Sequence, residues 1–463
     1  MCYYPSMKVV TDEKKIDDML TRGVGEFIDP DGVFRAKLKN NPGKIIIKFG
    51  VDPTRPDIHL GHAVVLRKLR QFQEMGCKVV FLIGDYTGQI GDPTGKSKVR
   101  PAVNFQEIKI NMETYLNQVD KILLKTSEVF DWTVNSDWFT SINDIGDPEN
   151  KKFNWTSPDG QTLNDIDPNS TIGKALIFEK TRRNKELLSV TLSSFLWSLK
   201  HITHSRLITR DMFQNRIENN EELYLHEMMY PVLQGADSFA LASIYGSCDL
   251  EVGGTDQTFN MLMGRDIMKF NKQEPQSVLS FKLLEGTDGK DKMSKSLDNY
   301  VGITDEPSDM YGKVMSIPDS SIGNYFELCT VAPLDEIAKI REDVKSGEVN
   351  PKDLKMNLAK QIVSIYHGEV EAQKAEESFT NTFQKKEIPD EMEEVKGEAG
   401  SLVSEVLVEN KILASKGEWR RLVAGNAIHD LVKNSEVTDV DVKLTENLTL
   451  KIGKKKFIKI LVN

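Results

Sequence analysis

The sequence predicts an α/β protein that opens with a Rossmann-like parallel sheet, continues with a helical domain and ends in a small α+β domain. Two apolar runs of strand length, Ile45–Ile47 and Val79–Ile83, predict the sheet, because a helical pattern lies between them. In that pattern, apolar residues recur at helical spacing from Val65 to Phe72. Alternating strand and helix is typical of a parallel sheet covered on both faces, which binds ligands beyond the carboxyl ends of its strands.

The first strand leads into the stretch around which the chain is organised, residues 45–62, which read IIIKFGVDPTRPDIHLGH. Gly50 ends the strand, and His59 and His62 lie one helical turn apart where the next helix begins. A helix N-terminus attracts anions because its free amide N–H groups point outward. The pair predicts imidazoles that donate hydrogen bonds to nucleotide phosphates. Two ordinary histidines at a helix start are the alternative.

Three polar residues share one face of an apolar helix further along the chain. Tyr230, Gln234 and Asp237 are spaced by four and three residues in YPVLQGAD. A carboxylate on an apolar face needs a hydrogen-bond donor, which a ligand hydroxyl would supply; a structural Asp with a protein donor is the alternative. Asp92, in the loop IGDPTGK after the second strand, is predicted to accept from an ammonium group or, alternatively, to belong to a plain turn.

Two later motifs carry groups that suit a nucleotide. In VGGTDQ, two glycines let the backbone approach a ligand closely, and Asp256 and Gln257 follow to hold its hydroxyls. The sequence GKDKMSKS predicts a mobile loop that brings Lys292 and Lys295 to a triphosphate, with the hydroxyl of Ser296 beside them. A hairpin turn and a solvated charged loop are the respective alternatives.

The charge of the chain is unevenly distributed. The formal net charge is -10, yet residues 401–463 hold 11 Lys and Arg against 8 Asp and Glu. We therefore expect nucleic acid to bind locally rather than over the whole surface. The N-terminal stretch lacks a signal or transit pattern, no apolar run has bilayer length, and the four cysteines have neither zinc-ligand nor disulfide spacing. These features predict a cytoplasmic protein.

Changes in composition predict the domain boundaries. We expect an α/β domain over 1–305, with an insertion at about 141–185 where Pro and Gly turns interrupt any helical period. Amphipathic helical sequence follows over 306–384. A charged linker poor in apolar residues is predicted at 385–399, and a compact α+β unit at 400–463.

Two of these motifs in this order resemble the signature pair of the class I aminoacyl-tRNA synthetases, His-x-Gly-His followed by Lys-Met-Ser-Lys-Ser. Within that class the chain resembles the bacterial-type tyrosyl-tRNA synthetases over FGVDPTRPDIHLGHAVVLRKLRQFQ, IGDYTGQIGDPTGKSK, YPVLQGADS, VGGTDQTFN and KMSKSLDNY. The tail, in ASKGEWRRLVAGNAI, is similar to a small RNA-binding fold first known from a ribosomal protein. The resemblance implies a catalytic domain, a helical domain on the anticodon side of tRNA and a C-terminal RNA-binding domain.

The resemblance also implies roles for individual residues. The catalytic set is His59, His62, Thr54, Lys292, Lys295 and Ser296. The ATP-binding set is Gly50, Asp52, His59, His62, Gly254, Asp256 and Lys295. The tyrosine-binding set is Asp92, Tyr230, Gln234, Asp237 and Gln257. The tRNA-binding set is Lys96, Arg100, Lys416, Arg420 and Arg421.

The implied activity is that of a tyrosine–tRNA ligase that uses ATP with Mg²⁺, has no structural metal, forms a homodimer and needs no membrane. The chain departs from the family pattern in two places. Lys48 stands where many members have Tyr, and Gly235-Ala236 replaces the common Ala-Tyr before Asp237. Three alternatives stay open: a tryptophanyl-tRNA synthetase, a nucleotidyltransferase of cofactor synthesis, and an RNA-binding or structural protein without catalysis.

Overall fold

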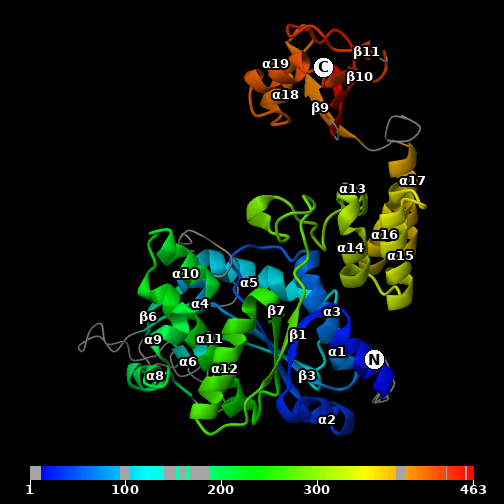
Figure 1. The fold of residues 1–463 in the computed structure, drawn as a ribbon. Coiled ribbons are helices and arrows are strands. Elements are labelled where there is room, and N and C mark those ends of the chain that lie inside the picture. The colour runs from blue at the N-terminus through cyan, green and yellow to red at the C-terminus, as the bar shows by residue number, and fades with distance from the viewer. Residues whose placement is uncertain are drawn as a thin grey trace, which may run out of the picture. The chain divides into compact units, whose positions relative to one another are not determined.

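The structure, a computed structural model, describes residues 12–93, 105–139, 153–156, 162–166, 188–381, 392–433, 435–453 and 456–462. The chain divides into two compact units, Met1–Glu369 and Val370–Asn463 (Figure 1). Among the described residues no helix is long and apolar enough to span a bilayer.

A six-stranded sheet forms the centre of the first unit, in the order β1-β8-β7-β2-β3-β4. All neighbouring strands in it are parallel except β1 and β8, so the predicted Rossmann-like parallel sheet is confirmed. Its strands are β1 (Val24–Ile28), β2 (Ile46–Val51), β3 (Lys78–Ile83), β4 (Phe130–Val134), β7 (Leu250–Gly254) and β8 (Ser277–Phe281).

The order of the strands places a ligand crevice beside β2. The chain runs from β2 outward to β3 and β4, and later returns to pair β7 with the other edge of β2. Such a reversal opens a crevice at the carboxyl ends of the strands, where helices on opposite faces diverge. The helices that matter here are α3 (Leu60–Glu74), α11 (Leu225–Tyr245) and α12 (Thr258–Phe270).

The sheet is buried on both faces, as its apolar strands predicted. On one face, Val80 and Leu82 of β3 pack against Leu241 of α11. Ile47 and Phe49 of β2 are the register partners of Val79 and Phe81, so they lie on the opposite face of the sheet, where they are also buried. Because these residues are apolar, the one charged side chain within β2, that of Lys48, is unusual.

Helices and one small hairpin make up the rest of the first unit. Within the predicted insertion at 141–185, only the hairpin β5 (Phe153–Thr156) and β6 (Thr162–Ile166) is described. The helices before α11 are α1 (Glu13–Thr21), α2 (Val33–Asn40), α4 (Thr87–Ile90), α5 (Phe105–Val119), α6 (Ser136–Phe139), α8 (Leu192–Leu199), α9 (His204–Ile208) and α10 (Asp211–Glu218). The later ones are α13 (Pro307–Met315), α14 (Ile322–Cys329), α15 (Leu334–Ser346) and α16 (Pro351–His367), with α17 (Glu369–Phe379) at the boundary between units.

The second unit contains a five-stranded sheet in the order β11-β10-β12-β13-β9 and two helices. Its core gathers around Trp419 and Ile458. The elements are β9 (Glu393–Gly397), α18 (Val403–Glu409), α19 (Lys416–Ala424), β10 (Ile428–Asp430), β11 (Ser435–Glu436), β12 (Leu448–Ile452) and β13 (Lys456–Val462).

The prediction of a linker over 385–399 is wrong for the second half of that range. Residues 393–397 form β9, which pairs in parallel with β13 at the edge of the sheet, whereas residues 385–391 lie outside the described part of the chain. The strand was missed because an edge strand faces solvent and carries charges; in EEVKG only Val395 offers an apolar side chain to the core. The compact unit therefore begins before residue 400.

Candidate active site

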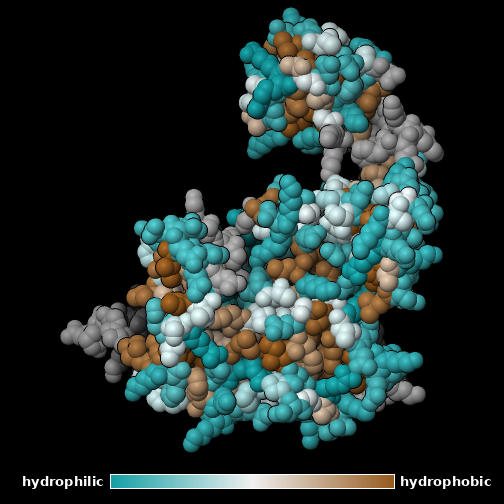
Figure 2. All heavy atoms as spheres, viewed as in Figure 1, coloured by the Kyte–Doolittle hydropathy of each residue, from teal (hydrophilic) through white to brown (hydrophobic). Residues whose placement is uncertain are grey.

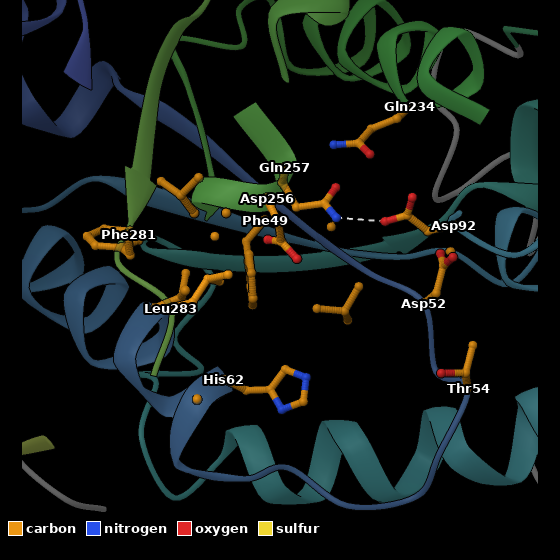
Figure 3. Close-up of a pocket in the computed structure, with 18 of the residues that line it drawn as sticks. Phe49, Asp52, Thr54, His62, Asp92, Gln234, Asp256, Gln257, Phe281 and Leu283 are labelled. Carbon is orange, nitrogen blue, oxygen red and sulfur yellow. Dashed lines mark hydrogen bonds between the residues drawn. The ribbon is translucent and has the colours of Figure 1, made fainter. Parts of the chain in front are cut away.

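A cavity of about 560 Å³ lies at the carboxyl ends of β2, β3 and β7 (Figure 3). Its lining comes from segments that are far apart in the sequence: residues 48–62, 230–237, 251–257 and 292–295. The structure thus brings the four predicted motifs to one cavity. In Figure 3, His62 lies on one side of it and Gln234 on the other. We call these sides the phosphate end and the amino-acid end.

The two histidines stand at the start of α3 in the phosphate end. His59 is the residue before the first turn of the helix, and the two ring centroids are 4.0 Å apart. The backbone N–H of His59 donates to Nδ1 of His62 at 3.4 Å, so the ring proton of His62 resides on Nε2. Burial, and then the nearby lysines, lower the pKa of His62 to about 3. A neutral ring with one N–H donor is therefore present at pH 7.

Burial also lowers the pKa of His59 far below its usual range. The neighbouring His62 and the two lysines of the motif lower this pKa further, by smaller amounts. The side chain of His59 is 7% exposed and borders the cavity. Both rings are consequently neutral and act as hydrogen-bond donors or acceptors. They do not bring the positive charge that two cationic imidazoles would carry.

Lys292 and Lys295 border the same end of the cavity, and each contacts an aspartate. Lys292 Nζ lies 2.7 Å from Asp256 Oδ2. Lys295 Nζ donates to the carbonyl oxygen of Asp57, lies 3.9 Å from its carboxylate and sits 5.8 Å from the ring centroid of Tyr115. Burial lowers the pKa of Lys295 to about 8, against the effect of Asp57.

The remaining predicted ATP-binding residues, Gly50, Asp52, Gly254 and Asp256, also line the cavity, as does Thr54 of the predicted catalytic set. Gly254 has a steric reason to be glycine, because a Cβ there would lie 2.6 Å from Asp256 Oδ1 and 2.7 Å from Leu283. The backbone of Ser296 lies in a 3-10 turn, Lys295–Leu297, but its side chain is outside the described part of the structure.

Asp237 is buried at the amino-acid end. Trp138 Nε1 donates to its Oδ1 at 2.9 Å, and Asn135 Nδ2 donates to its Oδ2 at 3.4 Å. Burial raises the pKa of Asp237 to about 7, while Lys48 and these two donors oppose the shift. Each carboxylate oxygen has two acceptor sites, so the protein donors leave capacity for a ligand hydroxyl.

All five predicted tyrosine-binding residues border the cavity: Asp92, Tyr230, Gln234, Asp237 and Gln257. Hydrogen bonds join them to other motifs. Gln257 Nε2 donates to Asp92 Oδ2 at 2.6 Å, the dashed line in Figure 3. Tyr230 Oη donates to Asp52 Oδ2 at 2.7 Å. The side chains of the amino-acid end are therefore held in place by hydrogen bonds within the protein.

The predicted tRNA-binding residues are not part of this cavity. Lys96 and Arg100 lie outside the described residues. Lys416, Arg420 and Arg421 are exposed on α19 of the second unit, and Lys416 pairs with Glu405. Two cationic side chains on this helix are thus available to a polyanion.

Sequence reasoning missed the residues that hold Asp237. Asn135 follows directly after the last residue of β4, and Trp138 lies one turn further, in α6. Their position at the carboxyl end of a parallel strand was the available signal, because functional side chains gather there. The buried pair Lys48–Glu251 was also not assigned a role; it lies on the floor of the cavity.

Comparison with known proteins identifies the family. The family described as "tRNA synthetases class I (W and Y)" matches residues 39–147 and 172–384, which leaves out part of the predicted insertion. The chain is 39% identical over 461 residues to a tyrosine–tRNA ligase 2 of Clostridium acetobutylicum, covering 98% of this chain and 100% of that protein. A tyrosine–tRNA ligase of Mannheimia succiniciproducens is 39% identical over 446 residues, 96% of this chain and 97% of that protein.

Solved structures of lower identity agree on the fold. A C-terminally truncated mitochondrial tyrosyl-tRNA synthetase of Aspergillus nidulans matches with a TM-score of 0.55 at 20% identity, over 80% of this chain and 93% of that one. A tyrosyl-tRNA synthetase of Archaeoglobus fulgidus, solved with L-tyrosine, matches with a TM-score of 0.52 at 19% identity, over 79% and 99%. By the length and identity of its sequence matches, the chain belongs to the class I tRNA synthetases, in the family of the tyrosine–tRNA ligases.

Proposed function

We propose that the cavity carries out both steps by which a tyrosine–tRNA ligase charges tRNA(Tyr). In the first step the carboxylate of tyrosine attacks the α-phosphorus of ATP, forming tyrosyl-adenylate and releasing pyrophosphate. In the second step the terminal ribose hydroxyl of the tRNA attacks the adenylate carbonyl, and AMP leaves. The observation that carries the proposal is the position of Asp237, a buried carboxylate with spare acceptor capacity, in the same cavity as His59 and His62.

The first step needs no protein nucleophile, since positioning and charge stabilisation supply the rate. At the phosphate end, His59, His62 and Thr54 would donate to phosphate oxygens. Lys292 and Lys295 would leave Asp256 and Asp57 for the triphosphate, because its greater negative charge outweighs that of a single carboxylate. Ser296 would add its hydroxyl. Gly50, Asp52, Gly254 and Asp256 would contact the adenosine.

At the amino-acid end, Asp92, Tyr230 and Gln234 would hold the ammonium group, and Gln257 would contact the amino-acid end of the adenylate. The phenol hydroxyl would donate to Asp237. A buried acceptor rejects an analogue that lacks the hydroxyl, because the acceptor capacity that Trp138 and Asn135 leave on the carboxylate would then stay unpaired.

Mg²⁺ would enter with ATP as part of the substrate. Among the residues that the structure describes, no group of three His, Cys, Asp or Glu side chains is arranged to hold a metal ion. Magnesium commonly keeps several waters and binds through substrate phosphates, which requires no such group. The protein would therefore supply orientation and the ion would supply phosphate charge neutralisation.

The second step implies a tRNA contact outside the cavity. We assign it to the α+β unit through Lys416, Arg420 and Arg421, to the helical region 306–384, and near the acceptor end to Lys96 and Arg100. Deleting residues 392–463, which removes the unit from β9 onward, should leave tyrosine-dependent ATP–pyrophosphate exchange within about twofold and reduce tRNA charging at least tenfold. Charging that survives this deletion would remove the unit from the tRNA site.

We propose that the protein forms a homodimer. Apolar side chains gather on the face over α8 and α11 (Figure 2). The exposed apolar residues of these helices include Leu192 (70% exposed) and Leu196 (51%) of α8 and Leu225 (75%) of α11. Patches of this kind commonly mark protein–protein contacts. Light scattering should give twice the chain mass, and Leu196→Lys should shift the protein toward the monomer; an unchanged mass would place the contact elsewhere.

The cellular compartment we infer is the cytoplasm, where ATP and tRNA are available. The described cysteines, Cys77, Cys248 and Cys329, are free thiols, which suits a reducing compartment.

The decisive experiment is ATP–pyrophosphate exchange with the purified protein and one amino acid at a time. Tyrosine should support exchange, and tryptophan or phenylalanine should support it far less. Exchange with tryptophan instead would favour the tryptophanyl relative. Exchange with neither would leave a nucleotidyltransferase or a protein without catalysis, and the proposal would fail.

A further inference from the structure

A charged pair with no role in the reaction above is buried at the floor of the amino-acid end. Lys48 of β2 and Glu251 of β7 are register partners on neighbouring parallel strands, so their side chains leave the sheet on the same face. The side chains are 0% and 2% exposed, and Lys48 Nζ lies 2.8 Å from Glu251 Oε1. An ion pair this deep is not explained by stability, because apolar residues of similar size usually stabilise a core at least as well.

Lys48 cannot itself contact a ligand hydroxyl, because its three N–H donors are in use. Besides Glu251, Nζ donates to the backbone oxygen of Gln234 at 2.8 Å and to Ser238 Oγ at 2.8 Å. Both acceptors belong to one turn of α11, and Asp237 lies between them in sequence. The ammonium group therefore ties the turn that carries Asp237 to the sheet.

Glu251 completes the attachment from the other side. Its Oε1 accepts from Gln234 Nε2 at 3.1 Å, and its Oε2 accepts from Ser238 Oγ at 3.1 Å and from Gln276 Nε2. A carboxylate is only an acceptor, so it orients the Gln234 amide with the nitrogen toward itself. The amide oxygen is thereby left to accept from Asn260 Nδ2 at 3.0 Å and from a ligand in the cavity.

We propose that Lys48 and Glu251 are positioning residues for amino-acid selection: the pair fixes the α11 turn from Gln234 to Ser238 so that Asp237 meets the substrate's hydroxyl as a charged acceptor. This rests on the proposed function and adds residues to it. The backbone of α12 packs closely against this turn, since a Cβ on Gly264 would lie 2.8 Å from Ser238 Oγ and 3.2 Å from Glu251 Oε2. Neither residue touches the reacting atoms.

The charges around Asp237 agree with this role. Lys48 faces it from β2, Glu251 from β7 and the neutral phenol of Tyr230 from its own helix. Burial raises the pKa of Asp237 to about 7; Lys48 opposes that rise more than Glu251 adds to it. Removing Lys48 should therefore raise the pKa of Asp237 further, and removing the charge of Glu251 should lower it.

The test measures kcat/KM for tyrosine and for phenylalanine in ATP–pyrophosphate exchange from pH 6 to pH 9. The tyrosine-to-phenylalanine ratio isolates Asp237, because groups at the phosphate end act equally on both amino acids. In Lys48→Met the ratio at pH 7 should fall about tenfold. The pH at which the ratio is half its maximum, its midpoint, should move up by about one pH unit. In Glu251→Gln the midpoint should move down, while KM for tyrosine rises more than kcat falls.

Lys37→Met is the matched control. Lys37 also forms an ion pair, with Asp249, the residue just before β7. It does not line the cavity, so its removal should leave the tyrosine-to-phenylalanine ratio and the midpoint of that ratio unchanged. If Lys48→Met does not fold, the direction in which Glu251→Gln shifts the midpoint is sufficient to test the inference.

A folded Lys48→Met with the wild-type ratio and midpoint would overturn the inference, as would a Glu251→Gln midpoint that stays or rises. A purely structural pair would lower yield or melting temperature and leave the ratio unchanged. Failure of the proposed function would show separately, as a wild-type protein without tyrosine-dependent exchange.

Discussion

The two ends of the cavity are built in opposite ways. At the amino-acid end, Asp237 and the pair Lys48–Glu251 are at most 3% exposed and are held by hydrogen bonds among two strands, β2 and β7, and two helices, α6 and α11. At the phosphate end, Lys292 is 40% exposed, and Lys295, itself 10% exposed, is held by Asp57, whose side chain is 42% exposed. One end is assembled in advance, and the other is held by contacts that a substrate can replace.

This difference matches two physical tasks. Selecting an amino acid by one hydroxyl needs an acceptor that does not move, because a mobile acceptor would adapt to the wrong ligand. Stabilising charge that grows on phosphate needs cations that follow the charge, which long lysine side chains on a loop can do. The predictions below test whether the ends are as independent as the contacts indicate.

The largest effect is expected at the phosphate end. Lys295→Ala should lower kcat for adenylate formation by about 10²–10³-fold, because the lost charge acts mainly in the transition state. KM for tyrosine should change by no more than about twofold. Exchange kinetics at saturating ATP measure both constants. A matching rise in KM for tyrosine would show that the two ends are coupled.

A smaller loss is expected at the amino-acid end. Asp237→Asn should lower kcat/KM for tyrosine by roughly 10–100-fold, which corresponds to the ~1.5–3 kcal/mol of a hydrogen bond to a charged group. KM for ATP should be unaffected. Asp57→Asn is the control at the other end, since a partner of Lys295 at 3.9 Å with an exposed side chain contributes little. Equal losses in the two variants would contradict the assignment of Asp237.

The smallest effect concerns stability. Because the pKa of Asp237 is raised to about 7 in the fold, the native protein holds a proton that the unfolded chain releases above about pH 4. The stability that this group contributes is complete below pH 4 and is lost as the pH rises through 7. Asp237→Asn should therefore melt a few degrees above wild type at pH 8 and less so at pH 5.

Calorimetry at the two pH values, without ligands, measures that difference. The same offset at both pH values would mean that Asp237 keeps an ordinary pKa. In that case the amino-acid end would be less buried from water than its geometry indicates.

Much of the site was predictable because its chemistry is local in the sequence. His59 and His62 sit one turn apart at a helix start whatever the rest of the chain does, and Tyr230, Gln234 and Asp237 share a helix face by spacing alone. The strand Val24–Ile28 escaped notice for the opposite reason: with Gly25 and Glu26 in it, only its pairing with β8 defines it.

By itself the amino-acid sequence determined the parallel sheet, through the period of its apolar residues, and the chemical groups that reach the cavity. Tertiary structure alone decided the partners of those groups: Lys48 with Glu251, Asp237 with Trp138, Lys292 with Asp256. Periodicity reports which face of an element is buried, whereas a hydrogen bond across the sheet depends on the register of strands some 200 residues apart in sequence.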